Sequence, residues 1–328
     1  MIATIEKEII ETQLYQNKII YDWLTFTSKI HDVSSMVEFL GLTGVSFMPL
    51  GGLNGYKDRL FYDGISIMYN GKEDMGICVQ FSGQGCRTFE TYGSGDFDSI
   101  FREILDNYSD TAEDRNMNIT RLDVAYDDFE RLIDIKQVLL DCQIGNFVSR
   151  CVDWSVTVGN KGCTINHGSN RSNVYIRIYD KKAEQRNENV EYWVRCELQI
   201  RGIDALGFIR ASGTIDDKYF KVLNNYLRYV VSDSNDSNKW RWCTAPHWLK
   251  WLRSFSSESI FSRPGIEYNI YHLDHYVFGQ AGPAVKTMID MIGVDEFVKQ
   301  LNKSRENKPI NPKYKKVIAQ YNELRKGR

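Results

Sequence analysis

Two neighbouring stretches between Ser169 and Gly202 alternate polar and apolar side chains with the two-residue period of a β-strand. On each stretch, one face carries groups capable of chemistry. The groups are Tyr175, Arg177, Tyr179 and Lys181 on the first stretch, and Arg195, Glu197, Gln199 and Arg201 on the second. If the two strands pair, all of these side chains lie on one surface of a sheet.

Tyrosine hydroxyls, cations and a carboxylate on one surface predict attack on a phosphodiester. A phenol, with an ordinary pKa of about 10, requires nearby cations or a metal ion to react as a phenolate. The same cations would neutralise the charge that develops on a phosphate under attack. We therefore expect this face to break and rejoin a nucleic-acid backbone. Alternation alone does not decide whether Tyr179 or Tyr175 is the nucleophile.

A third stretch, Asn118 to Asp128, adds carboxylates. Asp123 and Asp127 share one face of this expected strand, and Glu197 lies on the polar face described above. Three oxygen ligands near a phosphate suit Mg²⁺ or Mn²⁺, which would polarise a phosphoryl oxygen. The alternative is that Asp127 only ends a strand, where acidic residues are common.

Several other kinds of site are disfavoured. The sequence has no H-x-H pair, which argues against a histidine-paired metal site, and no P-loop, which argues against a nucleotide-driven motor. The seven cysteines contain no C-x-x-C and are odd in number, which argues against a zinc site and a disulfide framework. His272 and His275 are expected to serve as surface or capping residues. Trp240, Trp242, Trp248 and Trp251, mixed with cations, fit either base stacking or a helical core.

The composition is that of an ordinary globular protein, with 42% hydrophobic and 26% charged residues. No apolar run is long enough for a membrane span, and acidic residues interrupt the N-terminal apolar ones, so we expect a cytoplasmic protein with reduced thiols. The net charge of −2 argues against coating nucleic acid through bulk charge. A basic tail from Lys303 to Arg328 is the exception.

The order strand, helix, several strands, helix occurs twice, over about residues 19–108 and 118–212, and Asp22 and Asp123 hold comparable places. We therefore predict an α+β fold of two related antiparallel β-sheet/helix halves, from an internal duplication. They would form a catalytic core over residues 1–212, followed by a helical C-terminal region over 213–328.

Some individual elements are also expected from the sequence. Asp32 would cap a helix that ends at Gly41, and helical segments are expected near residues 283–302 and 312–326. Residues 61–71 would form one strand, with a turn at Asn70-Gly71. The glycine-rich segment S-G-Q-G-C-R (Ser82 to Arg87) would be a loop that meets phosphates or only a tight turn.

Five segments, in this order, resemble the Rep_trans family of replication initiation factors, which includes rolling-circle initiators and relaxases of integrative conjugative elements. The segments are Y-D-W-L-T-F-T, G-I-C-V-Q-F-S-G-Q-G-C-R-T-F-E, N-I-T-R-L-D-V-A-Y-D-D, H-G-S-N-R-S-N-V-Y-I-R-I-Y-D-K-K and W-V-R-C-E-L-Q-I-R. Each is loose alone, but the ordered set is specific. It spans about residues 21–202.

The resemblance implies a metal-dependent DNA nickase and religase that acts through a 5′-phosphotyrosine. The family's nucleophile falls on Tyr179, with Tyr175 as the fallback, and Mg²⁺ or Mn²⁺ would be held by Asp123 and Glu197, with Asp127 less favoured. Backbone contacts are expected from Arg177, Lys181, Arg195, Arg201, Gln199, Arg87 and Arg171.

The expected partners are single-stranded or hairpin origin DNA and a host helicase, and a homodimer is allowed. A conjugative relaxase would run the same chemistry at a transfer origin. A metal-dependent nuclease without a covalent step and a DNA-binding regulator are less favoured functions for the same residues.

Overall fold

The computed structural model describes residues 15–160, 162–253, 277–278, 281–306, 314–315 and 318. The chain divides into two compact units, residues 1–261 and 262–328. The boundary expected at 212/213 falls inside the first unit, because helices after it complete the same core. Phe220, Trp248 and Trp251 are buried there with side chains of the sheet.

The first unit alternates strands and helices. In chain order these are β1 (Lys18–Ser28), α2 (Val33–Phe39), β2 (Met48–Gly51), β3 (Asp58–Tyr62), β4 (Ile65–Tyr69), β5 (Ile77–Phe81), α3 (Gly83–Tyr92), α4 (Phe97–Asp106), β6 (Met117–Asp128), α5 (Ile135–Gln143), β7 (Phe147–Ser149), β8 (Trp154–Gly159), β9 (Gly162–His167), β10 (Val174–Asp180), α6 (Lys181–Gln185), β11 (Val194–Arg201), α7 (Gly202–Arg210), α8 (Ile215–Tyr226), β12 (Leu227–Tyr229), η1 (Lys239–Arg241) and α9 (Pro246–Arg253).

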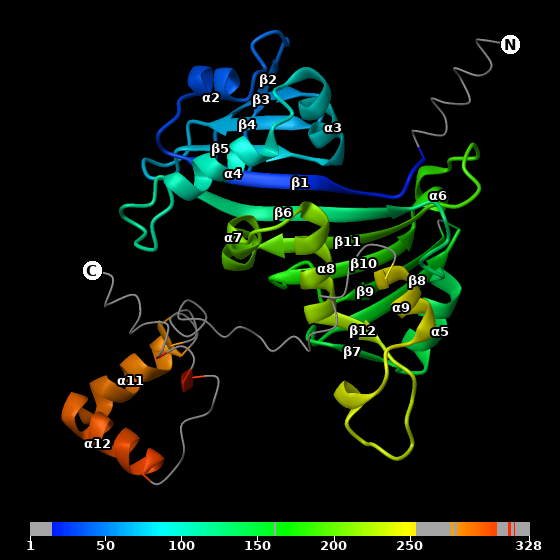
Figure 1. The fold of residues 1–328 in the computed structure, drawn as a ribbon. Coiled ribbons are helices and arrows are strands. Elements are labelled where there is room, and N and C mark those ends of the chain that lie inside the picture. The colour runs from blue at the N-terminus through cyan, green and yellow to red at the C-terminus, as the bar shows by residue number, and fades with distance from the viewer. Residues whose placement is uncertain are drawn as a thin grey trace, which may run out of the picture. The chain divides into compact units, whose positions relative to one another are not determined.

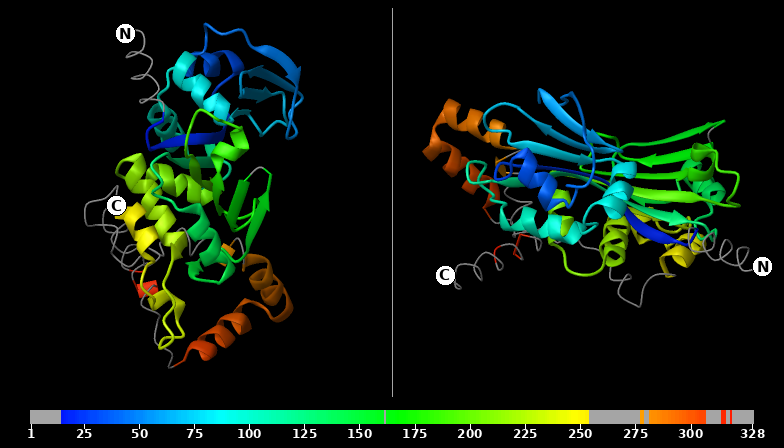
Figure 2. Two further views of the ribbon diagram at one scale, coloured as in Figure 1. Left: turned by 90° about the vertical axis from the view of Figure 1, so that its right-hand side faces the viewer. Right: turned by 90° about the horizontal axis from the view of Figure 1, so that it is seen from above.

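Ten of these strands form one antiparallel sheet in the order β2-β3-β4-β5-β1-β6-β11-β10-β9-β8 (Figure 1). Most helices of the first unit lie on one face of this sheet (Figure 2). Their buried side chains meet Leu24, Phe26, Leu122, Val124 and Leu198 in a continuous core. The other face of the second half is left for polar side chains.

The sheet consists of two matching halves that meet at β1 and β6. Reading outward from this seam, β1-β5-β4-β3-β2 on one side corresponds to β6-β11-β10-β9-β8 on the other. Leu24 pairs with Leu122 across the seam, with Phe81 and Ile200 as their outer partners. The duplication expected from the sequence is thus visible as an approximate two-fold axis, but its halves share one sheet.

The same register corrects the expected equivalence of Asp22 and Asp123. In the second half, Asp123 pairs with Gln199 on the next strand away from the seam. In the first half, Thr25 pairs with Gln80 on the next strand away from the seam. Thr25 is therefore the counterpart of Asp123. Asp22 does not match Asp123, because Asp22 lies at a shift of register in β1.

Two local features differ from the sequence-based expectation. Residues 61–71 form two strands, because Asp63 and Gly64 both have positive φ and make a tight turn between β3 and β4. The segment S-G-Q-G-C-R, expected as a glycine-rich loop, begins α3. Ser82 caps that helix by accepting a hydrogen bond from the Gly85 amide.

The tryptophans divide between the two interpretations offered above. Trp248 and Trp251 are buried and pack ring against ring, with centroids 4.7 Å apart, so they belong to the helical core. Trp240 is 52% exposed at the η1 turn. The cluster is therefore mainly structural.

The second unit contains α11 (Gly282–Ile292) and α12 (Val294–Arg305), which contact each other and confirm the helices expected near 283–302. His272, His275 and most of the basic tail lie outside the described residues. In the part of the chain that the structure describes, no helix has the length and apolar character to cross a membrane.

Candidate active site

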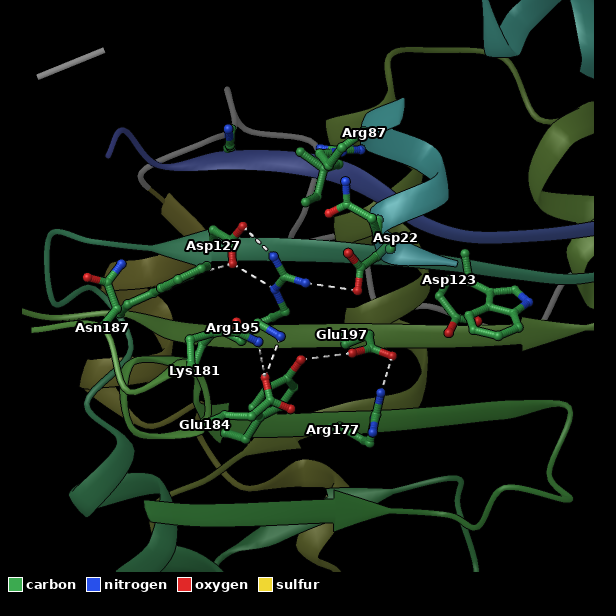
Figure 3. A pocket seen from close by; sticks show the side chains of 18 of the residues that line it. Asp22, Arg87, Asp123, Asp127, Arg177, Lys181, Glu184, Asn187, Arg195 and Glu197 are labelled. Carbon is green, nitrogen blue, oxygen red and sulfur yellow. Dashed lines mark hydrogen bonds and ion pairs between the residues drawn. The ribbon is translucent and has the colours of Figure 1, made fainter. Parts of the chain in front are cut away.

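A cavity of about 680 Å³ lies on the polar face of the sheet's second half. Its walls come from β1, α3, β6, β10, α6 and β11 (Figure 3). The two strands predicted to pair do pair in β10 and β11, with Arg177 opposite Glu197 and Tyr179 opposite Arg195. The shared polar face expected from the sequence is therefore present, and five of its side chains lie on the floor of this cavity: Arg177, Tyr179, Lys181, Arg195 and Glu197.

Tyr179 lies at the centre of the floor and is 6% exposed. Its hydroxyl donates a hydrogen bond to Glu197 Oε2 at 3.1 Å, while Arg177 donates to Glu197 Oε1. Glu197 is itself buried, so the charge of Arg177 compensates it where water cannot. The three residues form a chain of tyrosine, carboxylate and guanidinium.

The state of Tyr179 differs from the phenolate-favouring environment expected from the sequence. Burial and, to a smaller degree, the charge of Glu197 raise the pKa of Tyr179 well above its usual value. Arg177 and Lys181 lie near the ring, at 5.6 and 5.4 Å from its centroid, but Lys181 is paired with Glu184. In this arrangement Tyr179 is protonated, and Glu197 accepts the hydrogen bond from its hydroxyl.

Tyr175 lies apart from this chain. It shares the face of Tyr179, but its hydroxyl donates to Asn166 Oδ1 at 2.8 Å on the neighbouring strand β9, and the residue does not line the cavity. The structure therefore distinguishes two tyrosines that strand alternation could not.

Arg195 is not available for the phosphate contact expected of it. It is 5% exposed and donates to both carboxylate oxygens of Asp127 at 2.7 Å, and to Asp22 at 2.8 Å. Asp127 also accepts a hydrogen bond from the Trp193 indole at 2.6 Å. Both oxygens of Asp127 are thus engaged with Arg195 and one also with Trp193, so Asp127 anchors Arg195, and both oxygens of Asp123 are engaged with Arg121 in a similar way.

Asp22 and Asp123 are the carboxylates that remain near Glu197. Burial and, to a smaller degree, the charge of Glu197 raise the pKa of Asp123 to about 7, against the opposing effect of the two hydrogen bonds from Arg121. Burial also raises the pKa of Asp22, with Arg195 opposing and Glu197 adding to the shift. Asp22, Asp123 and Glu197 are each paired with an arginine, so burial is the larger cause of the raised pKa values of the two aspartates, and the charge of Glu197 adds to it.

Sequence reasoning missed Asp22 as a member of this site. In a regular strand, Asp22 and Trp23 would point to opposite faces, yet both line the cavity. A shift of register between Tyr21 and Trp23 inserts the extra residue that turns both inward. No signal in the sequence marks such a bulge.

Of the four remaining expected DNA contacts, Arg87 lines the cavity, and Gln199, Arg201 and Arg171 are not among its lining residues. Arg87 lines it but donates to the Tyr21 carbonyl and to Glu90. Gln199 is buried beside Asp123, and Arg201 is the strand partner of Arg121 at the end of β11. Arg171 is exposed in the turn between β9 and β10 and does not line the cavity.

The positions of Asp123, Glu197 and Arg177 have matching positions in the first half of the sheet. In the first half, the positions that match Asp123, Glu197 and Arg177 are occupied by Thr25, Cys78 and Met68. Cys78 and Met68 are buried against Tyr56. The first half therefore lacks this set of groups at the matching positions.

The donor set suits a hard divalent cation, although no three His, Cys, Asp or Glu side chains of the described residues already stand as a metal site. Asp22 and Asp123 present carboxylate oxygens, the ligands that Mg²⁺ and Mn²⁺ prefer. Burial raises the pKa of both carboxyls, and a cation bound between them would favour their charged forms.

Comparison with known proteins agrees with this division of the chain. Residues 18–104, the first half, match the N-terminal domain of rolling-circle replication initiation proteins, and residues 117–304 match the replication initiation factor family Rep_trans. A protein of Bacillus subtilis (strain 168) with the name "Putative DNA relaxase NicK" is 27% identical over 263 residues, which cover 74% of this chain and 73% of the relative.

A solved structure of a rolling-circle replication initiator protein from Geobacillus stearothermophilus is similar in fold and sequence. It has a TM-score of 0.65 and 28% identity, and the match covers 73% of this chain and 97% of that one. The Rep_trans match alone spans more than half of the 328 residues. This chain is therefore a member of the replication initiation factor family of rolling-circle initiators and relaxases.

Proposed function

We propose that this protein nicks and rejoins one strand of DNA at an origin through a covalent bond between Tyr179 and a 5′-phosphate. The observation that carries the proposal is the hydrogen bond from the Tyr179 hydroxyl to Glu197 on the floor of the cavity. It supplies both a nucleophile and a proton acceptor within reach of each other. The relatives named above are a rolling-circle replication initiator protein and a protein with the name "Putative DNA relaxase NicK".

In the proposed step, the Tyr179 hydroxyl gives its proton to Glu197 as the oxygen attacks the scissile phosphorus. The new bond joins the tyrosine oxygen to phosphorus, the bond from phosphorus to the 3′-oxygen breaks, and that oxygen takes up a proton to leave a 3′-hydroxyl. Protonation of Glu197 removes the negative partner of Arg177. The positive charge of Arg177 is then free to stabilise the phosphate oxygens as their charge grows.

We assign the divalent cation to Asp22 and Asp123, with Mg²⁺ or Mn²⁺ as the ion. When bound, it would polarise a phosphoryl oxygen of the scissile group. Glu197, expected earlier as a ligand, has one oxygen on Tyr179 and the other on Arg177, which places it for proton transfer. Asp127 keeps Arg195 in place.

The test uses random-sequence single-stranded DNA labelled at the 3′ end, incubated with the protein and Mn²⁺. A 5′-phosphotyrosine retains the 3′ fragment, so the label should migrate with the protein after denaturation. A library labelled at the 5′ end should lose its label instead. Sequencing the retained strands would give the preferred nick site.

Tyr179→Phe should abolish the adduct, and Tyr175→Phe, which removes a hydroxyl from the same strand, is the matched control and should retain it. Cleavage without any adduct would refute the covalent step in favour of a metal-dependent nuclease. An adduct that survives in Tyr179→Phe and disappears in Tyr175→Phe would move the nucleophile. Relaxase activity at a transfer origin uses the same chemistry, and the sequence of the retained strands would separate it from replication initiation.

A helicase partner, a homodimer and a cytoplasmic location remain expectations from the resemblance and the composition. We propose them only as the setting in which origin nicking would operate.

A further inference from the structure

Trp23 occupies a position that a regular strand would not give it. The bulge in β1 turns it into the cavity, directly opposite Asp123 on β6. Its indole is partly exposed there, next to the proposed cation ligands. A large aromatic group that is partly exposed beside a reactive site requires an explanation other than core packing.

The indole is held in one orientation. Its Nε1 donates to Thr25 Oγ1 at 2.8 Å, and the Arg121 guanidinium lies over the ring with Cζ 4.2 Å from the centroid. Arg121 is fixed in turn by its Nε, which donates to Asp123 Oδ1 at 2.9 Å. Two flat groups, one aromatic and one cationic, are therefore stacked and immobilised before any ligand arrives.

Hydrogen-bond donors without partners lie on the adjacent strand. Gln199 is the register partner of Asp123 and is 4% exposed, yet its Nε2 has no hydrogen-bond partner among the described residues. The Nε of Arg201, the register partner of Arg121, is also buried without a hydrogen-bond partner among the described residues. Burial and the neighbouring charge of Arg121 both lower the pKa of Arg201, as expected of two cations side by side. An acceptor such as a phosphate or base oxygen would satisfy both donors.

We infer that Trp23 and Arg121 form a stacking platform for one nucleobase of the single strand that crosses the cavity, with Gln199 and Arg201 facing the same nucleotide. Bases stack on aromatic rings and on guanidinium planes alike, because every base has a π-face. The inference rests on the proposed function only in that single-stranded DNA must occupy the cavity. It adds Trp23 as a residue that holds the DNA strand beside the nick.

The experiment measures binding without cleavage. Trp23→Ala and Trp23→Phe are made in the full chain carrying Tyr179→Phe, and the probe is a short dye-labelled thymidine oligonucleotide read by fluorescence anisotropy. Trp23→Ala should weaken binding by about five- to a hundredfold, the range of one lost base–aromatic stack. Trp23→Phe should retain most of the affinity. Trp154→Ala is the matched control, because Trp154 is 46% exposed on β8 and does not line the cavity.

A second probe has the same sugar-phosphate chain without bases. The parent protein should bind it more weakly than the thymidine oligonucleotide, and Trp23→Ala should make no further difference, since no base remains to stack. Equal weakening of both probes by Trp23→Ala would show a merely structural role and overturn the inference, as would unchanged binding of both. Absence of a covalent adduct in the protein that retains Tyr179, in the preceding experiment, would refute the covalent nicking mechanism without affecting this result.

Discussion

Charged side chains in the cavity occur as pairs of opposite sign. Arg121 holds Asp123, Arg177 holds Glu197 and Arg195 joins Asp127 to Asp22, in an environment that is mostly buried. Alternation along strands predicts which of these residues share a face, and it did so for the β10–β11 pair. It does not predict which cation neutralises which acid, because that depends on the register between strands and on the bulge at Asp22.

His167 shows how a single buried group sets the response to acid. It is fully buried, and its Nε2 lies 2.9 Å from the Tyr229 hydroxyl. Burial lowers the pKa of His167 to about 3, whereas in an unfolded chain it is about 6.5. Below pH 6.5 the unfolded chain therefore binds a proton that the fold does not accept, and the free energy of unfolding falls as pH falls.

We predict that His167→Phe costs about 1 kcal/mol near neutral pH, because the Tyr229 hydroxyl loses a partner. Between about pH 6.5 and pH 5 the wild type should lose about 2 kcal/mol that the variant does not lose, so the order of stability should reverse. Urea unfolding at about pH 7.5 and about pH 5 measures both differences. If the two proteins lose stability in parallel, His167 is not the group that titrates.

At the scale of elements, most helices and strands follow from apolar periodicity and capping residues. The helix at Asp32 and the strand β6 fall where the sequence places them. The Asp63–Gly64 turn was missed although Asp-Gly is a strong hairpin signal, because the flanking apolar residues resemble one long strand. The helix α3 was missed because two glycines in its first turn lower its helix propensity.

Those glycines have a packing reason that the sequence does not state. Gly85 of α3 lies against the turn at Gly64, and a Cβ on Gly85 would come within 2.3 Å of the Gly64 carbonyl oxygen. The helix can therefore approach the hairpin closely only without a side chain at this position. Tertiary packing overrides propensity here.

Gly85→Ala should accordingly lower the free energy of unfolding by about 1–3 kcal/mol through this overlap with backbone. Gly207→Ala is the matched control, since Gly207 is an exposed position inside α7 where a Cβ meets nothing within 4 Å. That substitution should stabilise the protein by about 0.5–1 kcal/mol. Chemical denaturation of both variants checks the signs, and a stabilising Gly85→Ala would contradict the close contact.

At the scale of the whole molecule, the two halves of the sheet share their longest ladder, between β1 and β6, and one continuous core. The sequence predicted the repeat of elements but not the fusion of the two halves, because strand order along the chain does not determine which strands form the seam. A shared seam and core predict that neither half opens without the other.

Buried thiols on either side of the seam test this cooperativity. Cys86 of the first half and Cys196 of the second are both fully buried and free, and Cys243 is exposed. Pulse alkylation with peptide-resolved mass spectrometry should give Cys86 and Cys196 the same free energy of opening, equal to that of global unfolding, while Cys243 reacts at once. Leu24→Ala removes a fully buried side chain at the seam and should lower both opening free energies together, by about 2–5 kcal/mol. Faster labelling of Cys86 alone would show that the first half opens independently. The second half would then be stable while the first half is open.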